Sequence, residues 1–177
     1  MKQIIVYGSE YGTSKNYAEK LSQMTGIKVT GYKDINELTE YDLIIYFGGL
    51  YAGSVKGLKK TVKRIRQNTR FIIVTVGLAD VCDKENTDNI KRALSKQVPK
   101  RILGNAAVFH LRGGIDYKKL NLKHRLMMTA LYNTVKKLPE EEKTPETKAL
   151  IETFNSKVDF VDYSSLNQII KAIDQTE

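Results

Sequence analysis

The chain has 177 residues, 41% of them hydrophobic, which suffices for one domain with a buried core of ordinary size. No apolar run approaches the roughly 18 residues that a membrane-spanning helix needs. Met1-Lys2-Gln3 leads directly into an apolar run, so we expect no signal peptide. The single cysteine, Cys82, excludes a disulfide framework, and we expect a cytoplasmic protein with one domain over residues 1–177.

The net charge of +9 is unevenly distributed. Residues 43–125 carry 18 Lys and Arg against 5 Asp and Glu, whereas the rest of the chain carries 11 against 15. A basic middle region can meet anionic lipid, an acidic protein, a carboxylate-bearing substrate or nucleic acid, and it can equally be an ordinary solubilising surface. We find no nucleic-acid recognition module and no metal-ligand spacing, so neither nucleic acid nor a metal is expected.

Five short apolar runs have the length and composition of buried parallel strands. They are residues 3–7, 27–30, 43–47, 71–76 and 106–111. Apolar residues at helical spacing predict helices between them. These residues are Tyr17, Ala18, Leu21 and Met24, then Val55, Leu58, Val62 and Ile65, then Ile90, Ala93 and Leu94. Gly26 stands where a helix C-terminus favours glycine, and residues 34–41 form a connector or a short helix.

The last third of the chain is less regular. We predict one long helix over residues 120–138, with an apolar side made of Leu122, Leu126, Ala130, Leu131, Val135 and Leu138. A charged loop bounded by prolines follows at 139–145. Ser165 and Gln168 have the spacing of a capping box for a closing helix. The buried face expected for that helix is Leu166, Ile169, Ile170 and Ile173.

Strands that alternate with helices in this way predict an α/β domain, a doubly wound parallel sheet with helices on both faces. Ligands of such sheets bind beyond the carboxyl ends of the strands. Glycine-bearing segments follow the first, third, fourth and fifth predicted strands. We therefore expect these segments to meet at one edge and to form the binding site.

The segment after the first strand predicts a phosphate-binding loop with the sequence Ser9-Glu10-Tyr11-Gly12-Thr13-Ser14. Its serine and threonine residues supply hydroxyls, its glycine supplies the bend, and the following helix adds backbone N–H groups at its positive end. Neither a Walker A loop nor the dinucleotide fingerprint fits this spacing. Glu10 is expected to point to solvent, because a carboxylate repels a phosphate. A strand-turn-helix junction without a ligand is the alternative interpretation.

This loop resembles the FMN phosphate loop of flavodoxins and their relatives. The resemblance implies a five-stranded parallel sheet of order 2-1-3-4-5 and FMN as the cofactor. In flavodoxin-like proteins the loops after the third and fourth strands wrap the flavin ring, so Tyr51 and Leu78 are expected to contact it. The cofactor-binding residues implied are Ser9, Glu10, Tyr11, Gly12, Thr13, Ser14, Gly49, Leu50, Tyr51, Ala52, Gly53, Gly77, Leu78 and Ala79.

A second resemblance is scattered over nearly the whole chain. Residues 107–117 and 122–128, with Arg125-Leu126-Met127-Met128, look like the FMN-dependent protoporphyrinogen IX dehydrogenases of bacteria. Residues 139–173 resemble the acidic, threonine-rich loop, short strand and final helix of that family. Where the family has aromatic residues before its arginine, this chain has Leu-Asn-Leu-Lys-His at 120–124. The resemblance implies an oxidoreductase of porphyrin biosynthesis.

Three functions are open from the sequence. They are an FMN oxidoreductase with a small-molecule substrate, a flavodoxin-type electron carrier that meets a redox partner protein, and a flavin-free α/β binding module. The net charge of +9 disfavours the carrier, because electron-carrying flavodoxins are usually acidic. No catalytic residue is assigned. We expect His110 in the core, His124 exposed, and Cys82 as a small, partly buried side chain.

A basic rim is expected near Lys118, Lys119, Lys123 and Arg125. It can hold the carboxylates of a substrate. Residues 118–125 can instead make a peripheral contact with an anionic membrane. The third interpretation is an ordinary solvated helix face.

Overall fold

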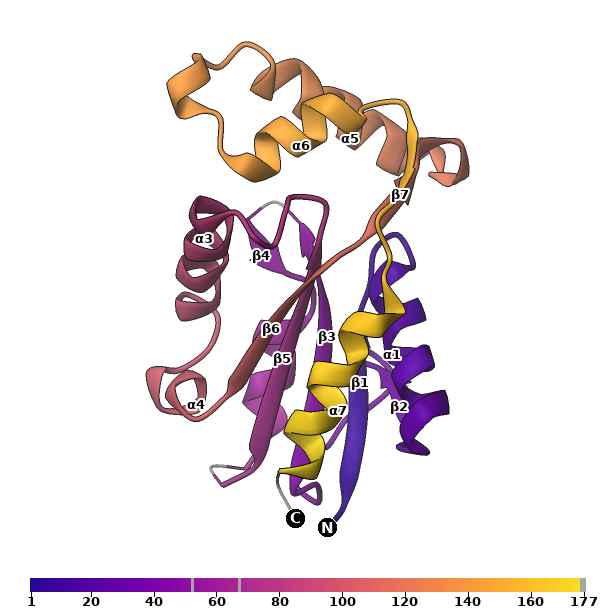
Figure 1. The fold of residues 1–177 in the computed structure, drawn as a ribbon, viewed down its shortest axis with the longest axis vertical. Helices are drawn as coiled ribbons and strands as arrows, with labels where there is room; N and C mark the ends of the chain where they lie inside the picture. Colours follow the sequence, from indigo (N-terminus) through magenta and orange to yellow (C-terminus); the bar gives the residue numbers. More distant parts are fainter. Residues whose placement is uncertain (52, 67, 176–177) are drawn as a thin grey trace.

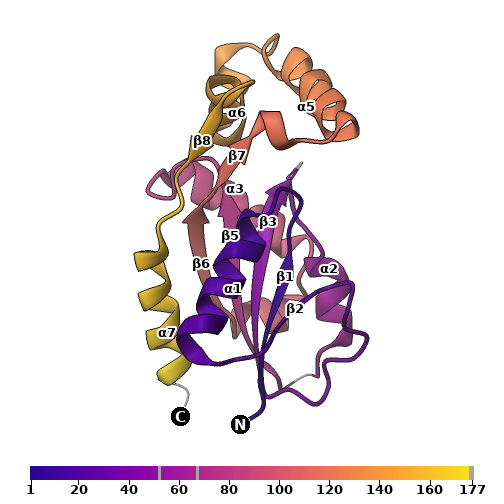
Figure 2. The same cartoon turned by 90° about the vertical axis from the view of Figure 1, so that its right-hand side faces the viewer.

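The structure is a computed structural model that describes residues 1–51, 53–66 and 68–175. A central sheet has helices on both faces, and two further helices lie beyond one end of it (Figures 1 and 2). Both termini lie at the opposite end (Figure 1). In the described part of the chain, no helix has the length and apolar character needed to cross a membrane.

The sheet has parallel strands in the order β2-β1-β3-β5-β6, and the short β4 pairs antiparallel to β3. Counted without β4, this is the order 2-1-3-4-5, so the predicted fold class is confirmed. The strands are β1 Gln3–Gly8, β2 Val29–Gly31, β3 Leu43–Tyr51, β4 Ser54–Val55, β5 Arg70–Gly77 and β6 Ala107–Arg112.

Two hydrophobic cores lie on the two faces of the sheet, because neighbouring residues of a strand point to opposite sides. Ile4 and Ile44 pack in the core that α2, α3 and α4 cover, whereas Ile5 and Ile45 pack in the core beneath α1 and α7. The bounds of these helices are α1 Thr13–Thr25, α2 Leu58–Thr61, α3 Lys84–Ser95, α4 Lys100–Gly104 and α7 Leu166–Asp174.

Residues 113–160, called the insertion below, separate β6 from α7 and form the layer beyond the sheet (Figure 2). Its two short strands pair antiparallel and carry two helices between them. These elements are β7 Gly114–Asp116, α5 Leu122–Val135, α6 Pro145–Thr153 and β8 Lys157–Asp159. The insertion has a small core of its own, which contains Ile115, Tyr117, Met128, Val135 and Leu150. Single 3₁₀ turns occur at Val62–Arg64, Tyr117–Lys119, Glu140–Glu142 and Tyr163–Ser165.

Tyr17 fastens both ends of the insertion to α1. Its side chain is 1% exposed, and its hydroxyl donates a hydrogen bond to the carbonyl oxygen of Arg112 at 2.9 Å. The same hydroxyl accepts a hydrogen bond from the backbone N–H of Asp162 at 2.9 Å. Because Arg112 enters the insertion and Asp162 leaves it, one buried side chain of α1 fixes the place from which the insertion extends.

Two predictions in the first half of the chain are wrong in their bounds. The strand predicted to end at Phe47 continues to Tyr51, because Gly48 and Gly49 pair with β5 and Leu50 pairs with β4. The helix predicted over 55–65 shrinks to α2 and one 3₁₀ turn, since Val55 lies in β4 and Gly57 turns the chain with a φ of 78°. Met24, predicted to be buried, is 44% exposed.

The predictions for the last third need more correction. The long helix is α5, and its predicted apolar side is partly wrong: Val135 is buried and Leu138 packs against the core as expected, but Leu122 and Leu126 are 73% and 62% exposed, and Met128 faces the core instead. The helix α6 follows the predicted loop and was not foreseen. Ser165 makes no side-chain cap, because a 3₁₀ turn capped by Asp162 precedes α7. The buried face of α7 is confirmed for Leu166, Ile169 and Ile173, with Ile170 partly buried.

Candidate functional site

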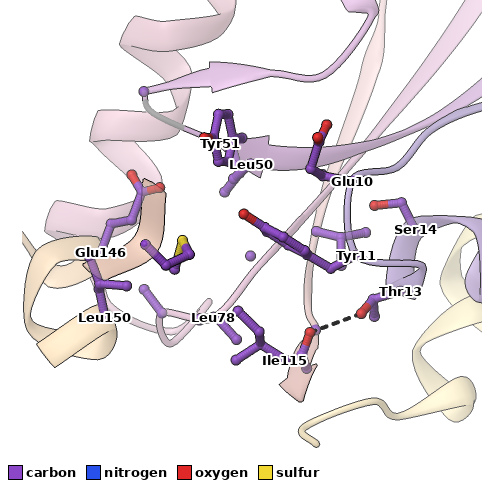
Figure 3. A pocket seen from close by; sticks show the side chains of 18 of the residues that line it. Glu10, Tyr11, Thr13, Ser14, Leu50, Tyr51, Leu78, Ile115, Glu146 and Leu150 are labelled. Carbon is purple, nitrogen blue, oxygen red and sulfur yellow. Dashed lines mark hydrogen bonds between the residues drawn. The ribbon is translucent and has the colours of Figure 1, made fainter. Parts of the chain in front are cut away.

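A cavity of about 240 Å³ lies between the carboxyl ends of the strands and the insertion (Figure 3). The predicted site residues that line it are Ser9, Glu10, Tyr11, Thr13, Ser14, Gly49, Leu50, Tyr51, Gly53, Gly77, Leu78 and Ala79. Gly12 is not in the lining, and Ala52 lies outside the described residues. The structure therefore brings three segments, distant in the sequence, to one rim of the sheet.

The phosphate loop ends at an α1 N-terminus without a side-chain cap. Gly12 is the N-cap residue with a φ of 93°, and its N–H donates to Ser9 Oγ at 3.0 Å. The first turn of α1 contains no acidic residue, and Ser14 is buried at 2% exposure while it lines the cavity. Free N–H groups and the positive end of the helix dipole make this terminus suited to an anion.

One predicted phosphate ligand has a structural partner. The Thr13 hydroxyl donates to the carbonyl oxygen of Gly114 at 3.0 Å, as Figure 3 shows. Thr13 thereby joins the phosphate loop to the first strand of the insertion. A side chain at Gly113 would also collide there, since its Cβ would lie 2.9 Å from Val76 Cγ1 and 3.3 Å from Thr13 Cγ2. The contact between loop and insertion requires glycine at this position.

Glu10 does not point to solvent, which corrects the prediction. Its side chain is 19% exposed and forms an ion pair with Lys56. The second carboxylate oxygen lies 2.8 Å from Nε2 of His124, on α5. Burial would raise the pKa of Glu10, but hydrogen bonding and charge from Lys56, helped by His124, hold it below its ordinary value. His124 is therefore a partner of the loop rather than an exposed side chain.

The contacts of Glu10 with Lys56 and His124 make the stability of the protein depend on pH. We expect Glu10→Gln to lower the thermal midpoint at pH 7, since the carboxylate is stabilised only in the folded state. This stabilisation is present above the unfolded-state pKa of about 4.3 and is lost as the pH falls through the lower folded-state pKa. The difference between the wild-type and E10Q midpoints should therefore shrink in melts below about pH 4.

The exposed Glu152 offers a matched control for this measurement, because its side chain lies on the outer surface of α6. Glu152→Gln should leave the thermal midpoint close to that of the wild type both at pH 7 and below about pH 4. A constant E10Q deficit across the pH range would contradict the role assigned to the ionised Glu10.

Aromatic rings stand between the phosphate loop and the insertion. Tyr11 meets Tyr51 edge to face at 6.3 Å between centroids and His124 at 5.5 Å. Its hydroxyl is buried without a hydrogen-bond partner in the described structure, and burial raises its pKa above the ordinary tyrosine value. In Figure 3 the Tyr11 ring extends from the phosphate loop into the cavity. A buried donor of this kind is suited to a bound molecule.

The wall opposite Tyr11 belongs to the insertion and was missed by the sequence prediction. Its apolar members are Ile115, Met128, Leu131, Val135 and Leu150. Glu146 of α6 lies on the same wall (Figure 3). The residue as a whole is exposed, but the protein around its carboxyl raises the pKa of that group by desolvation. Gly113 and Gly114 were recognised as a strand end, but no sequence signal placed α5 and α6 over the cavity.

The loop after β5 is held by contacts that leave its apolar residues facing the cavity. Arg112 donates to the carbonyl oxygen of Leu78 at 3.0 Å from Nη2, and its guanidinium stacks on the Phe160 ring at 3.8 Å. Leu50 packs over Gly77, where a Cβ would lie 2.7 Å from Leu50 Cδ1. Tyr51 and Leu78, the predicted ring contacts, both line the cavity.

The other polar candidates lie apart from the cavity lining. His110 is half-buried in β6, with Nδ1 2.7 Å from the Thr75 hydroxyl, and burial lowers its pKa. Cys82 is exposed, which corrects the prediction of partial burial. Within residues 1–51, 53–66 and 68–175, no group of His, Cys, Asp and Glu side chains is placed to hold a metal ion.

The family of the chain follows from a comparison with domain models. The sequence matches the flavodoxin domain model over residues 4–144, and no curated protein is found to match it. Similar solved structures include a flavoprotein in complex with FMN from Lactobacillus acidophilus NCFM, with 15% identity, 63% of this chain and 91% of that chain covered, and a TM-score of 0.43.

Two further structures have comparable likeness. Smu.1420 from Streptococcus mutans UA159 has 12% identity, 73% and 95% coverage and a TM-score of 0.44. A flavodoxin mutant from Pseudomonas aeruginosa has 12% identity, 73% and 93% coverage and a TM-score of 0.36. The family match spans well over half of the sequence, and it coincides with the sheet and the loop that line the cavity. The chain belongs to the flavodoxin domain family.

Proposed function

We propose that the cavity binds FMN and that the protein is a redox flavoprotein. The observation that carries this proposal is that an anion-binding helix terminus and an apolar cavity lie side by side at the carboxyl ends of the strands. An α1 N-terminus without a side-chain cap meets a cavity walled by aromatic and aliphatic side chains. FMN has the matching chemistry, a phosphate at one end and a flat, largely apolar ring at the other.

The residues present fit this cofactor. Backbone N–H groups of Thr13 and Ser14 and the Ser14 hydroxyl would hold the phosphate, while Tyr51 and Leu78 would lie against the ring. The unpartnered hydroxyl of Tyr11 would find an acceptor on the cofactor. Bound FMN supplies one- and two-electron transfer. The protein's own part is to orient the cofactor, to exclude water from it and to set the charge around it.

We further propose that the protein is an oxidoreductase similar to protoporphyrinogen IX dehydrogenases. The insertion favours an enzyme over a carrier, because it places an apolar wall and the Glu146 carboxyl over the cavity. Such a wall suits an apolar organic substrate, whereas a carrier needs an accessible cofactor edge for a protein partner. Glu146, with its raised pKa, is the ionisable group of this wall that can exchange a proton with a substrate.

The first test compares FMN with riboflavin, which lacks the phosphate. We expect FMN to bind at least about tenfold more tightly, since charge-assisted hydrogen bonds to the phosphate contribute more than neutral ones. Titration of flavin fluorescence with purified protein measures both dissociation constants. The Ser14→Ala variant should reduce the difference between the two dissociation constants, because it weakens the binding of FMN and not that of riboflavin. Equal affinity for the two flavins would show that the loop does not hold a phosphate.

The second test separates enzyme from carrier. The FMN-loaded protein is mixed anaerobically with protoporphyrinogen, and the flavin absorbance is followed. Rapid bleaching is expected of an oxidoreductase with this substrate. A flavin that stays oxidised with protoporphyrinogen, yet is bleached by a reduced electron-transfer protein, would assign the chain to the carriers.

A further inference from the structure

The phosphate loop is held to the insertion at two separate places. Next to the sheet, the Thr13 hydroxyl donates to the carbonyl oxygen of Gly114 in β7. Farther along the loop, Glu10 lies 2.8 Å from Nε2 of His124 in α5, whose ring also meets Tyr11 edge to face. Figure 2 shows α5 beyond the end of the sheet at which β1 turns into α1. The position of α5 is therefore tied to the loop that is suited to an anion.

Glu10 places a negative charge inside this loop. It lines the same cavity as Ser14 in the first turn of α1. The carboxylate would repel a phosphate bound there, because like charges interact more strongly where protein replaces water. The ion pair with Lys56 balances one negative charge, and a phosphate monoester adds close to two more. A bound phosphate therefore favours further positive charge beside Glu10.

His124 is placed to supply that charge. A carboxylate only accepts hydrogen bonds, so Nε2 of the neutral imidazole carries the hydrogen and Nδ1 is the atom that takes up a further proton. The His124 side chain is 19% exposed. It also lines a second cavity of about 250 Å³ between the phosphate loop and residues 116–124. Protons from solvent can therefore reach the ring.

The charged and titratable groups around this contact are of both signs. They come from the phosphate loop, the segment before α2, the second cavity and α5 itself, and they are Glu10, Tyr11, Lys56, Asp116, Lys119, Lys123 and Arg125. The tyrosine stays neutral, because burial raises the pKa of its hydroxyl. The two cations of α5 are exposed, so water and salt screen their charge. The two carboxylates balance the two remaining lysines, so the charge of an added phosphate favours the imidazolium form of His124.

We propose that His124 is a positioning residue of the cofactor site and takes up a proton at Nδ1 when the FMN phosphate binds. The proton comes from solvent, and the resulting imidazolium holds Glu10 through Nε2, and with it the phosphate loop, against α5. This inference rests on the proposed binding of FMN and goes beyond it, because it couples the cofactor to the insertion and to pH. By linkage, a site that gains a proton on binding holds its ligand more tightly as the pH falls.

Fluorescence titration of the full chain with FMN at pH 8.5 and at pH 7 tests the proposal. We expect the wild type to bind FMN at least about twofold more tightly at pH 7, since an ordinary histidine is neutral at the higher pH and partly charged at the lower one. The FMN phosphate stays largely doubly ionised over this range, so its own titration contributes little. Riboflavin, which lacks the phosphate, should bind with the same affinity at both pH values.

Two substitutions separate the charge of residue 124 from its packing. His124→Gln keeps a hydrogen-bond donor for Glu10 but carries no charge, so its affinity for FMN should be the same at both pH values. His124→Arg is charged at both pH values and should bind FMN at least about twofold more tightly than the glutamine variant at pH 8.5. A contact that only packs would be weakened in both variants and at either pH.

The other histidine of the chain provides a matched control. His110 lies in β6 and does not line either cavity. His110→Gln should keep the pH dependence of FMN binding that the wild type shows. Loss of that dependence in the control would show that the proton is not taken up at residue 124.

NMR of the two histidine rings gives a readout apart from affinity. At pH 7, FMN should move the ring signals of His124 toward those of an imidazolium and leave those of His110 in place. Riboflavin has the same ring system as FMN, so it controls for signal changes that the flavin itself causes, and it should not produce the imidazolium signals.

The outcomes distinguish this inference from the proposed function. Absence of FMN binding to the wild type at both pH values would overturn the proposed function and this inference with it. Binding of FMN with one pH dependence in the wild type and in His124→Gln would overturn this inference alone. The same holds if riboflavin shares the pH dependence of FMN, or if FMN leaves His124 in its neutral form.

Discussion

Replacing Gly8 with alanine should destabilise the protein by about 3 kcal/mol, because overpacking of a closed site costs up to this much or more. The new Cβ would fall deep inside the contact distance of the Lys56 carbonyl oxygen and 2.5 Å from Tyr46 Oη. Both neighbours are rigid: one is backbone, and the Tyr46 ring is fully buried and donates its hydroxyl to that same carbonyl. The chain after β4 would have to move.

This movement would also reach the candidate site. Lys56 forms the ion pair with Glu10, so displacement of residue 56 should loosen the phosphate loop and weaken FMN binding as well as stability. Urea unfolding followed by circular dichroism measures the loss of stability. An unchanged midpoint in Gly8→Ala would contradict the close approach of β1 to the segment after β4.

Gly104→Ala is the matched control for this prediction. Gly104 ends α4, and a Cβ built there meets no atom within 4 Å. The alanine should raise stability by about 0.5 kcal/mol, because it restricts the unfolded chain and favours the helix. We therefore expect the same substitution to lower the free energy of unfolding at Gly8 and to raise it at Gly104.

The second large effect concerns two buried tyrosines. Tyr11 and Tyr117 are the residues whose buried hydroxyls have no partner in the described structure. Removing either hydroxyl should stabilise the protein without cofactor by about 1–3 kcal/mol, the cost of an unsatisfied buried polar group. Burial also raises the pKa of Tyr117 to about 12, which agrees with a hydroxyl that is shielded from water.

FMN binding should separate the two variants. Tyr11 lines the cavity and Tyr117 does not, so Tyr11→Phe should weaken FMN binding by up to about tenfold while Tyr117→Phe leaves it unchanged. Fluorescence titration with FMN and thermal melts of the cofactor-free proteins give both quantities. Wild-type FMN affinity in Tyr11→Phe would mean that this hydroxyl does not meet the cofactor.

Local patterns were sufficient to predict the strands of the sheet and the turn at residues 9–14 that leads into α1. Continuous apolar runs such as residues 43–47 can be satisfied only by burial on both faces, which is the environment of a parallel strand. Small and hydroxyl residues at the end of the first strand predicted the turn into α1. Strand order came from the family resemblance, because pairing between distant segments leaves no local signal.

The environment of single residues was harder to predict. Glu10 was expected in solvent because a carboxylate repels a phosphate, yet Lys56, between β4 and α2, and His124, on α5, reach it. Leu122 and Leu126 were expected to be buried because helical spacing identifies an apolar stripe but not what covers it. Gly48 and Gly49 were expected in a loop because glycine usually interrupts strands, although pairing with β5 keeps them in the sheet.

The sequence by itself determined the alternation of strands and helices, the two-sided core and the loop at residues 9–14, since burial, turn geometry and helix termini act over a few neighbouring residues. Only the tertiary structure decided where the insertion lies. Its direction depends on Tyr17, on the pairing of β7 with β8 and on the contact between His124 and Glu10. These contacts join segments far apart in the chain, and they place α5 and α6 over the cavity while leaving Leu122 and Leu126 in solvent.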